Sequence, residues 1–469
     1  MALHPRSNAI ESRWGGPRVA LAAILLGAAA LRLAGVRYGL PLGGLLDPDE
    51  LNVVPRSWTM THGAGADPQW FDYPTLVFYV LAPVEWIFSA PSFLAARLVI
   101  AALGVAGVAA AWWLGRRAYG TVAGAVAACV TAVETTHVFY SHVGVTDVPL
   151  TLGVTATLAL AVAGRLELAG LAAGLATSFK YPGVVLAVPL VVAGWRRWLR
   201  LSLSLFLAAA AFVGASPFVA VHAGDAWRAV TGVDRLVRDG WLGFEHDHWA
   251  GIAFASRLWH GLGPALAVCV VGLVAALVSR RRPDLVLASF FLVYYVALLP
   301  LRAHFDRYTL PLVPPLAALA GRMRSLTPVT LLLLVVPLVW SIRNDARLTL
   351  TDTRVVADHW VEAHVPHGAG IAADSPTLPL EGFRLLSLAL PGPGRPSDPN
   401  RSLPRLRAQG FRYVVVTGTV ADRVRAASRR YPREERFYEA LAASARRIYY
   451  VSSGHDLSGP WVAVYYLSS

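Results

Sequence analysis

Four groups of acidic residues lie between the apolar segments of this chain. Asp47-Pro48-Asp49-Glu50 forms the first group, Asp72 and Asp147 stand singly, and Glu245-His246-Asp247-His248 forms the last. Carboxylates serve as general bases, and carboxylates together with histidines bind divalent metals. Such chemistry requires that segments far apart in the sequence meet at one place in the fold.

The first and the last of these groups also have purely local interpretations. Asp47 as N-cap, Pro48 at the first helical position and Glu50 at the third would make a good helix start. A His-x-His pair alone is not a zinc signature, because a zinc site needs three or four ligands with supporting partners. A helix start and a solvated loop therefore compete with the functional interpretations.

The composition is that of a membrane protein. Of the 469 residues, 55% are hydrophobic and only 15% are charged, and the mean hydropathy is +0.50, outside the range of soluble enzymes. Residues 19–38, 93–114 and 201–221 approach or exceed the roughly 17–25 apolar residues that cross about 30 Å of hydrocarbon. Because lipid-exposed segments of this kind form helices, we expect a polytopic α-helical protein of the inner (plasma) membrane.

The formal net charge of +13 comes from short arginine clusters at the ends of apolar segments. A nucleic-acid-binding protein would instead show a basic stripe, so no nucleic-acid partner is expected. The positive-inside rule places such clusters in cytoplasmic loops. The clusters are Arg116-Arg117, Arg196-Arg197-Arg200, Arg280-Arg281-Arg282 and Arg322-Arg324. They predict a path of about eleven spans with a cytoplasmic N-terminus.

On this path, residues 39–92 and 224–259 are long outer loops, and residues 74–89 within the first loop form an interfacial helix. Residues 168–179 and 183–195 form a short out-and-back pair, and broken helices at membrane depth are tolerated where they line a cavity. All four acidic groups then lie on the outer side.

The composition changes to mixed polar sequence from about residue 343. Residues 1–342 are therefore expected to form a membrane domain. Residues 343–469 are expected to form a small extracytoplasmic α/β domain, with a strand at 413–417.

Five stretches together resemble the dolichyl-phosphate-mannose protein mannosyltransferase and aminoarabinose-transferase-like families of the C-type glycosyltransferase superfamily. Each stretch is a weak signal alone, but their order and spacing cover most of the membrane region. The stretches are Asp49-Glu50, Asp72-Tyr73-Pro74, residues 141–150 around Asp147, residues 174–182 ending in Lys180-Tyr181-Pro182, and Arg307-Tyr308-Thr309-Leu310-Pro311.

The resemblance implies a glycosyltransferase that takes a sugar from a polyprenyl-phosphate carrier in the membrane. An acceptor hydroxyl attacks the anomeric carbon while the phosphate leaves, so the site needs a carboxylate base and cations. Asp49 would be the base, Glu50 would orient or support it, and Asp147 would be the aspartate of the second loop. Direct displacement would invert the anomeric centre. The acceptor, a glycan, a lipid or a protein of the cell envelope, is left open.

Four residues are candidates for binding the donor phosphate. Lys180 and Arg307 come first, with Tyr308 from the same Arg-Tyr motif, and Arg97 is a weaker candidate. An arginine binds phosphate as a planar fork and a lysine as a compact charge. The competing interpretation, strongest for Arg97, is snorkelling to the membrane interface.

A divalent metal is a further hypothesis. Some relatives bind a metal between a carboxylate equivalent to Asp72 and a histidine of a later loop, so the resemblance implies Asp72 with His246 or His248. Relatives often have lysine where this chain has Asp72-Tyr73. This difference leaves open which cation holds the phosphate.

The main alternative function is a transporter or lipid flippase. Such a protein would show inverted repeats and charges near the middle of the membrane. The sequence shows no internal repeat, and its ionisable cluster is predicted at the outer face. The enzyme is therefore the preferred interpretation.

Overall fold

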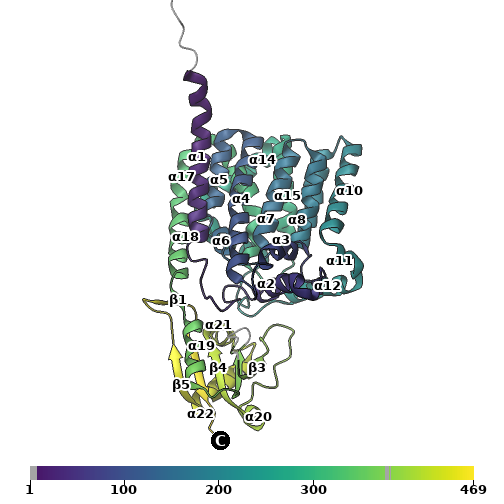
Figure 1. Cartoon of the computed structure of the whole chain (residues 1–469). Coiled ribbons are helices and arrows are strands. Elements are labelled where there is room, and N and C mark those ends of the chain that lie inside the picture. Colours follow the sequence, from purple (N-terminus) through teal and green to yellow (C-terminus); the bar gives the residue numbers. More distant parts are fainter. Residues whose placement is uncertain (1–7, 375–379, 381, 469) are drawn as a thin grey trace, which may run out of the picture.

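The computed structural model describes residues 8–374, 380 and 382–468. The described chain is mostly helical, and its long helices stand side by side above a smaller C-terminal segment (Figure 1). The upright helices are α1 (Asn8–Leu33), α4 (Phe93–Tyr119), α5 (Thr121–Val133), α7 (Asp147–Val162), α8 (Leu166–Phe179), η2 (Tyr181–Leu186), α9 (Ala187–Gly194), α10 (Trp198–Ala215), α14 (Ala265–Ser279), α15 (Arg282–Leu298), α16 (Val313–Arg322), α17 (Thr327–Leu333) and α18 (Val335–Leu348).

Shorter elements surround the lower ends of these helices, next to the C-terminal segment (Figure 1). They position the site described below. They are α2 (Glu50–Thr59), η1 (Met60–Ala64), α3 (Leu76–Glu85), α6 (Thr135–Tyr140), α11 (Pro217–Val221), α12 (Ala223–Asp239), α13 (Ala250–Leu262) and η3 (Asp306–Leu312). The short η4 (Arg324–Leu326) lies at the other end of the helices, where Arg324 donates to the Tyr119 oxygen (2.8 Å).

The upright helices pack through small residues. A Cβ added to Gly170 or Gly174 of α8 would lie 2.0 or 2.2 Å from backbone oxygens of α10, and one on Gly272 of α14 would lie 2.3 Å from the Leu319 oxygen of α16. Glycines at such positions let helix backbones approach closely, as is typical of packing within membranes.

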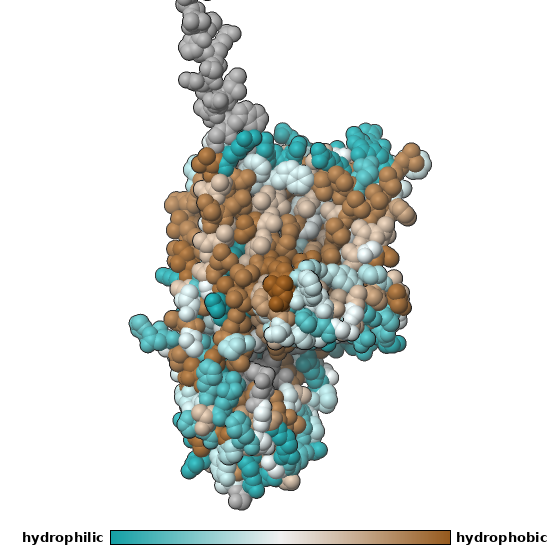
Figure 2. All heavy atoms as spheres, viewed as in Figure 1, coloured by the Kyte–Doolittle hydropathy of each residue, from teal (hydrophilic) through white to brown (hydrophobic). Residues whose placement is uncertain are grey.

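The outer surface of the helices is apolar. Figure 2 shows brown side chains over most of the upright helices and teal ones at the upper rim and over the C-terminal segment. Within the described residues, four helices are long and apolar enough to cross a membrane, or five if the bent pair α13–α14 is one span. Further apolar helices, among them α5, α7 and α8, are shorter. The membrane location predicted from the composition is supported by these helices.

The arginine clusters gather at one end of the helices. Arg322 at the end of α16 binds Asp284 (3.1 Å), which also accepts a hydrogen bond from Tyr119 at the end of α4 (2.7 Å). Arg282 donates to the Ala193 oxygen near the end of α9 (3.0 Å). Arg200 pairs with Glu167 at the start of α8 (2.6 Å). The predicted common side for these clusters is thus found in the fold.

The short out-and-back pair is present as predicted. α8 ends at Phe179, Lys180 is extended (φ −158°, ψ 132°), and η2 with α9 returns. A Cβ on Gly183 would lie 2.7 Å from the backbone of Thr177, so the turn closes tightly on itself. The break therefore places Lys180 at the point where the chain reverses.

One predicted loop proves to be helical. Residues 223–239 of the expected outer loop form α12, and residues 250–262 form α13. On α12, Arg228 pairs with Asp225 and Arg238 with Asp234, at spacings of three and four residues. Pairs of opposite charge three or four residues apart stabilise a helix. In the sequence alone, the same charged residues look like those of a solvent-exposed loop. The expected interfacial helix is α3, whose ten residues span about 15 Å, too short to cross the membrane.

The C-terminal segment contains a five-stranded sheet of order β3-β2-β4-β7-β5. β2 (Gly370–Asp374) pairs in parallel with β3 (Arg384–Leu388) and β4 (Phe411–Thr417), and β7 (Val462–Tyr466) runs antiparallel between β4 and β5 (Arg446–Val451). Helices α19 (Thr353–His364), α20 (Leu403–Ala408), α21 (Gly418–Ala426) and α22 (Pro432–Ser444) accompany the sheet, and β1 (Thr351–Asp352) pairs with β6 (Leu457–Ser458).

Side chains of β4 alternate between two apolar clusters, with Val414 and Val416 in one and Val415 in the other. The sheet is therefore covered on both faces. The cluster of Val415 also includes Leu42 and Leu45 of the loop before α2. The C-terminal segment thus packs directly on the loop that carries the first acidic group.

Candidate active site

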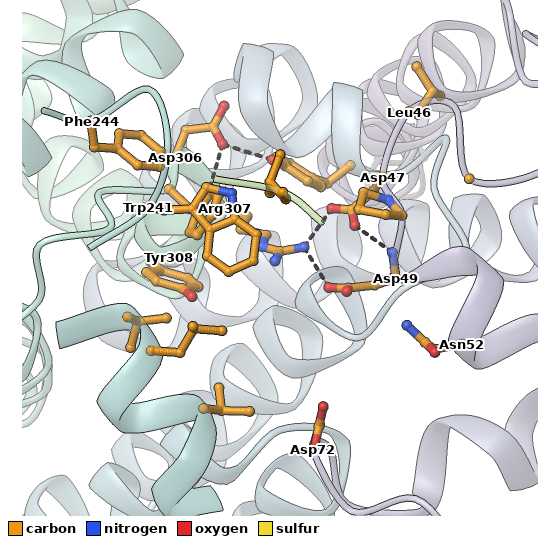
Figure 3. A pocket seen from close by; sticks show the side chains of 18 of the residues that line it. Leu46, Asp47, Asp49, Asn52, Asp72, Trp241, Phe244, Asp306, Arg307 and Tyr308 are labelled. Carbon is orange, nitrogen blue, oxygen red and sulfur yellow. Dashed lines mark hydrogen bonds and ion pairs between the residues drawn. The ribbon is translucent and has the colours of Figure 1, made fainter. Parts of the chain in front are cut away.

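A cavity of about 620 Å³ lies between the lower ends of the helices and the C-terminal segment. Figure 3 shows the loop before α2 on one side of it and η3 on the other. The lining combines acids, cations and aromatic rings. It includes Asp47, Asp49, Asp72, Lys180, Arg257, Arg307, Tyr73, Tyr308, Trp241 and Phe244.

Two carboxylates of the first acidic group share the guanidinium of Arg307. Nη1 of Arg307 lies 2.5 Å from Oδ2 of Asp47 and 3.0 Å from Oδ2 of Asp49 (Figure 3). Tyr73 donates its hydroxyl to the same Oδ2 of Asp49 (2.5 Å). Oδ1 of Asp49 receives no hydrogen bond from the described residues, and the side chain is 23% exposed. Asp49 therefore keeps one oxygen available to a ligand.

Their surroundings shift the pKa values of the two carboxyls in opposite directions. Burial raises the pKa of Asp47 to about 6, although the charge of Arg307 opposes the shift. Burial also acts on Asp49, but Arg307, the Tyr73 hydroxyl and Lys180 outweigh it and hold the pKa of Asp49 below its ordinary value. At neutral pH Asp49 is therefore ionised and able to accept a proton.

Asp147 and Lys180 form a buried ion pair of 2.6 Å. Lys180 also faces the cavity, and its Nζ lies 5.2 Å from the Tyr73 ring centre and 5.4 Å from that of Tyr308. Oδ2 of Asp147 is buried and receives no hydrogen bond from the described residues. The structure thus brings together Asp49, Lys180, Arg307 and Tyr308, with Asp147 behind Lys180.

Glu50 and Arg97 do not have the expected positions. Arg97 is fully buried and grips both oxygens of Glu50 through Nε and Nη2 (2.8 and 2.7 Å), and neither residue lines the cavity. Glu50 also accepts hydrogen bonds from the backbone of Gly44 and Gly144 (3.2 and 2.8 Å). Unlike the other three candidates for phosphate binding, Arg97 thus lies away from the cavity, with its charge paired to Glu50. The Glu50 carboxylate joins two loops to Arg97 and makes no hydrogen bond to the Asp49 side chain among the described residues.

The helix-start interpretation of the first acidic group is also wrong in its details. α2 begins at Glu50 with Asp49 at the N-cap, and no side chain caps it. Asp47 instead accepts the Asp49 backbone N–H (3.0 Å) and binds Arg307. The acids are therefore held by tertiary contacts.

The predicted metal ligands are not brought together. Asp72 lines the main cavity, but in Figure 3 it lies apart from Asp47 and Asp49. His246 donates to the Ala426 oxygen (2.9 Å), and His248 lines a different cavity. Within the described residues, no three His, Cys, Asp or Glu side chains form a group that could hold a metal ion. The loop of His246 docks on the C-terminal segment, and these residues do not fit a metal site.

Several cavity residues were not predicted from the sequence. Asp306 accepts the Tyr140 hydroxyl (2.8 Å). Arg257 binds Asp247 (2.7 Å), which also contacts His304 (3.1 Å). The only feature of the sequence that could have indicated these residues is that they lie in, or next to, segments predicted on the outer side.

The C-terminal segment completes the cavity. Arg354, Leu390, Thr419, Val420 and Arg423 line it. Arg354 pairs with Asp352 (2.6 Å) and donates to the Leu45 oxygen (2.9 Å), two residues before Asp47. The loop of the acids is therefore tethered to the C-terminal segment.

Comparisons with known proteins agree on the fold. Residues 72–220 match the family described as dolichyl-phosphate-mannose-protein mannosyltransferase. A search of curated proteins finds no match. Among solved structures, the chain is similar to ArnT from Cupriavidus metallidurans in the apo state, with a TM-score of 0.63 and 16% identity over 97% of this chain and 98% of that chain.

Two further structures were determined with a lipid phosphate bound. ArnT bound to undecaprenyl phosphate gives a TM-score of 0.59 at 15% identity, over 96% of this chain and 98% of that chain. The second is the archaeal oligosaccharyltransferase AglB from Archaeoglobus fulgidus in complex with an inhibitory peptide and a dolichol-phosphate. Its TM-score is 0.58 at 12% identity, over 98% of this chain and 75% of that chain. The resemblance drawn from the motifs is thus confirmed, and the chain has the fold of the C-type membrane glycosyltransferases.

Proposed function

We propose that this protein transfers a sugar from a polyprenyl-phosphate carrier to an acceptor hydroxyl in the cavity beside Asp49. The observation that carries the proposal is the meeting of Asp49, Lys180, Arg307 and Tyr308 around one cavity, although they are far apart in sequence. A carboxylate beside several cations suits a reaction that moves a proton and releases a phosphate.

In the proposed reaction, Asp49 takes the proton of the acceptor hydroxyl through its available Oδ1. The hydroxyl oxygen forms a bond to the anomeric carbon while the bond from that carbon to the phosphate oxygen breaks, and the electron pair leaves with the phosphate. A single displacement of this kind inverts the anomeric centre. Tyr73 and Arg307 orient Asp49 through its other oxygen.

The departing phosphate needs positive charge. Lys180 and Arg307 line the cavity and are proposed to attract it, with the Tyr308 hydroxyl as a hydrogen-bond donor. Both cations already have carboxylate partners. They therefore provide a site of balanced charge in which an arriving phosphate competes with Asp147 and Asp47.

We further propose that the cavity opens away from the cytoplasm. α7 runs from Asp147 beside the cavity towards the end with the arginine clusters, and its 16 residues span about 24 Å. The positive-inside rule assigns the clustered end to the cytoplasm. About eleven crossings, a cytoplasmic N-terminus and two domains, residues 1–342 and 343–469, then follow as parts of the same proposal.

The test is cleavage of radiolabelled polyprenyl-phosphate sugars by the purified protein in lipid nanodiscs. We expect release or transfer of label by the wild type and a loss of about 100-fold or more in Asp49→Asn, because general-base catalysis contributes about that much. Asp234→Asn, an exposed α12 carboxylate outside the cavity, is the matched control. In sealed proteoliposomes, movement of intact donor across the bilayer without cleavage would favour a flippase instead.

A further inference from the structure

The cations that line the cavity are already neutralised, with one exception. Among the described residues, four of these lysine and arginine side chains each lie within 4 Å of a carboxylate oxygen. The pairs are Lys180 with Asp147, Arg257 with Asp247, Arg307 with Asp47 and Asp49, and Arg354 with Asp352. An anion that binds one of these cations must compete with the carboxylate already paired with it.

Arg423 is the exception. It lies on α21 and lines the cavity, and its side chain makes no ion pair or hydrogen bond with the described residues. The acid whose charge reaches it is Glu245. The two oxygens of Glu245 accept hydrogen bonds from the Gly243 N–H and the Tyr431 hydroxyl, both at 2.7 Å. The guanidinium of Arg423 is thus available to bind another anion.

The orientation of α21 gives Arg423 this position. Thr419 and Arg423 are four residues apart and so share one helix face, and both line the cavity. The side-chain carbons of Arg423 pass beside Gly243, where an added Cβ would lie 3.1 Å from Cδ. Arg425 lies on another face and contacts Asp422 and Glu435 instead. One arginine of α21 is therefore directed to the cavity and one is not.

Arg423 lines the side of the cavity that the C-terminal segment forms. In Figure 1 this segment, with α21 at its upper side, lies beyond the ends of the upright helices. Lys180, by contrast, ends α8 within the helical part. On the proposed sugar transfer, a carrier lipid in the bilayer would bring its phosphate to the side of the cavity that contains Lys180. An acceptor that enters from outside the bilayer would meet the side that contains Arg423.

We propose that Arg423 binds an acidic group, a phosphate or a carboxylate, on the acceptor, so that this enzyme selects anionic acceptors. The inference rests on the proposed sugar transfer and adds the class of acceptor to it. An arginine side chain has five N–H donors and, when it has no partner among the described residues, it can form charge-assisted hydrogen bonds with such groups.

The experiment follows the fate of the sugar from a radiolabelled polyprenyl-phosphate donor. Purified protein in nanodiscs receives a lipid and glycan extract from the envelope of a strain that lacks the gene. The label transferred to the extract is divided by the label released to water. We expect Arg423→Gln to lower this ratio at least tenfold and Arg423→Lys to lower it less.

Arg425→Gln is the matched control, since it removes the same charge from the same helix outside the cavity. Thermal melting of both variants verifies folding. An equal fall of transfer and release in Arg423→Gln, with the ratio unchanged, would assign Arg423 to the donor phosphate and overturn the proposal.

The product offers a second test that needs no variant. The labelled product of the wild type should bind an anion-exchange resin at pH 7, and should lose that binding when its phosphate or carboxylate groups are removed or esterified. A neutral labelled product would overturn the proposal while leaving sugar transfer intact. Failure of the wild type to cleave the donor would instead overturn the proposed function itself.

Discussion

Asp47 and Asp49 share one guanidinium yet differ in how readily each takes up a proton. The difference arises because Tyr73 donates to Asp49 and not to Asp47, and because Asp47 is more deeply buried. A hydrogen bond to the charged form of a carboxyl lowers its pKa, and burial raises it. The base and its neighbour are therefore distinguished by their surroundings, although both are aspartates.

This arrangement predicts the pH dependence of the reaction. As the pH falls through about 6, Asp47 takes up a proton and its charge is lost. Arg307 then binds Asp49 alone, which makes Asp49 a weaker base. We expect kcat to fall below about pH 6 in the wild type. Asp47→Asn should be slow at all pH values and lack this fall, and an unchanged profile in Asp47→Asn would contradict the assignment.

Glu50 offers a prediction about stability. Its removal leaves Arg97 buried without a counter-charge, which costs about 3–5 kcal/mol. We expect Glu50→Ala to lower the melting temperature of the purified protein markedly, whereas Asp49→Asn changes it little. Full thermal stability with lost activity in Glu50→Ala would indicate instead that Glu50 takes part in catalysis.

The sequence predicted which residues carry charge near the site but not how they pair. Asp49, Lys180 and Arg307 were found because motifs mark them. The burial of Arg97 against Glu50 could not be predicted, because it depends on the packing of α4, which no local pattern reports. Arg423 was not predicted at all, since one arginine in a basic helix is indistinguishable from its neighbours until the helix is placed.

The break between α8 and η2 controls the position of Lys180. Gly183 permits this turn because a side chain there would meet the backbone of Thr177. We expect Gly183→Val to displace Lys180 and lower donor cleavage at least tenfold. Gly214→Val in α10, where nothing lies within 4 Å of the added Cβ, is the control. Equal cleavage by the two variants would show that the turn is not needed.

At the scale of elements, apolar helices could be predicted and amphipathic ones could not. The pair around Lys180 is recognisable because two short apolar runs flank a polar break. α12 escaped prediction because its charged residues suggest a solvated loop, although pairs such as Arg238 with Asp234 stabilise a helix.

The proposed topology of the whole molecule can be tested with single cysteines. Ser453 is exposed in the C-terminal segment, and Ser325 is exposed at the end with the arginine clusters. A membrane-impermeant maleimide on intact spheroplasts should label Ser453→Cys and not Ser325→Cys. Both should react after lysis, and the wild type, whose Cys129 and Cys269 lie within α5 and α14, sets the background. The reverse pattern would invert the orientation.

The tether between Arg354 and Leu45 joins residues that are 309 positions apart. Most of the chain must therefore be synthesised before the loop of Asp47 and Asp49 can form this contact with the C-terminal segment. Until then, a chain already inserted in the bilayer has Asp49, Lys180 and Arg307 but not the side of the cavity that Arg354 and the later residues form. On the proposed function, the site is therefore completed only when the C-terminal segment has folded.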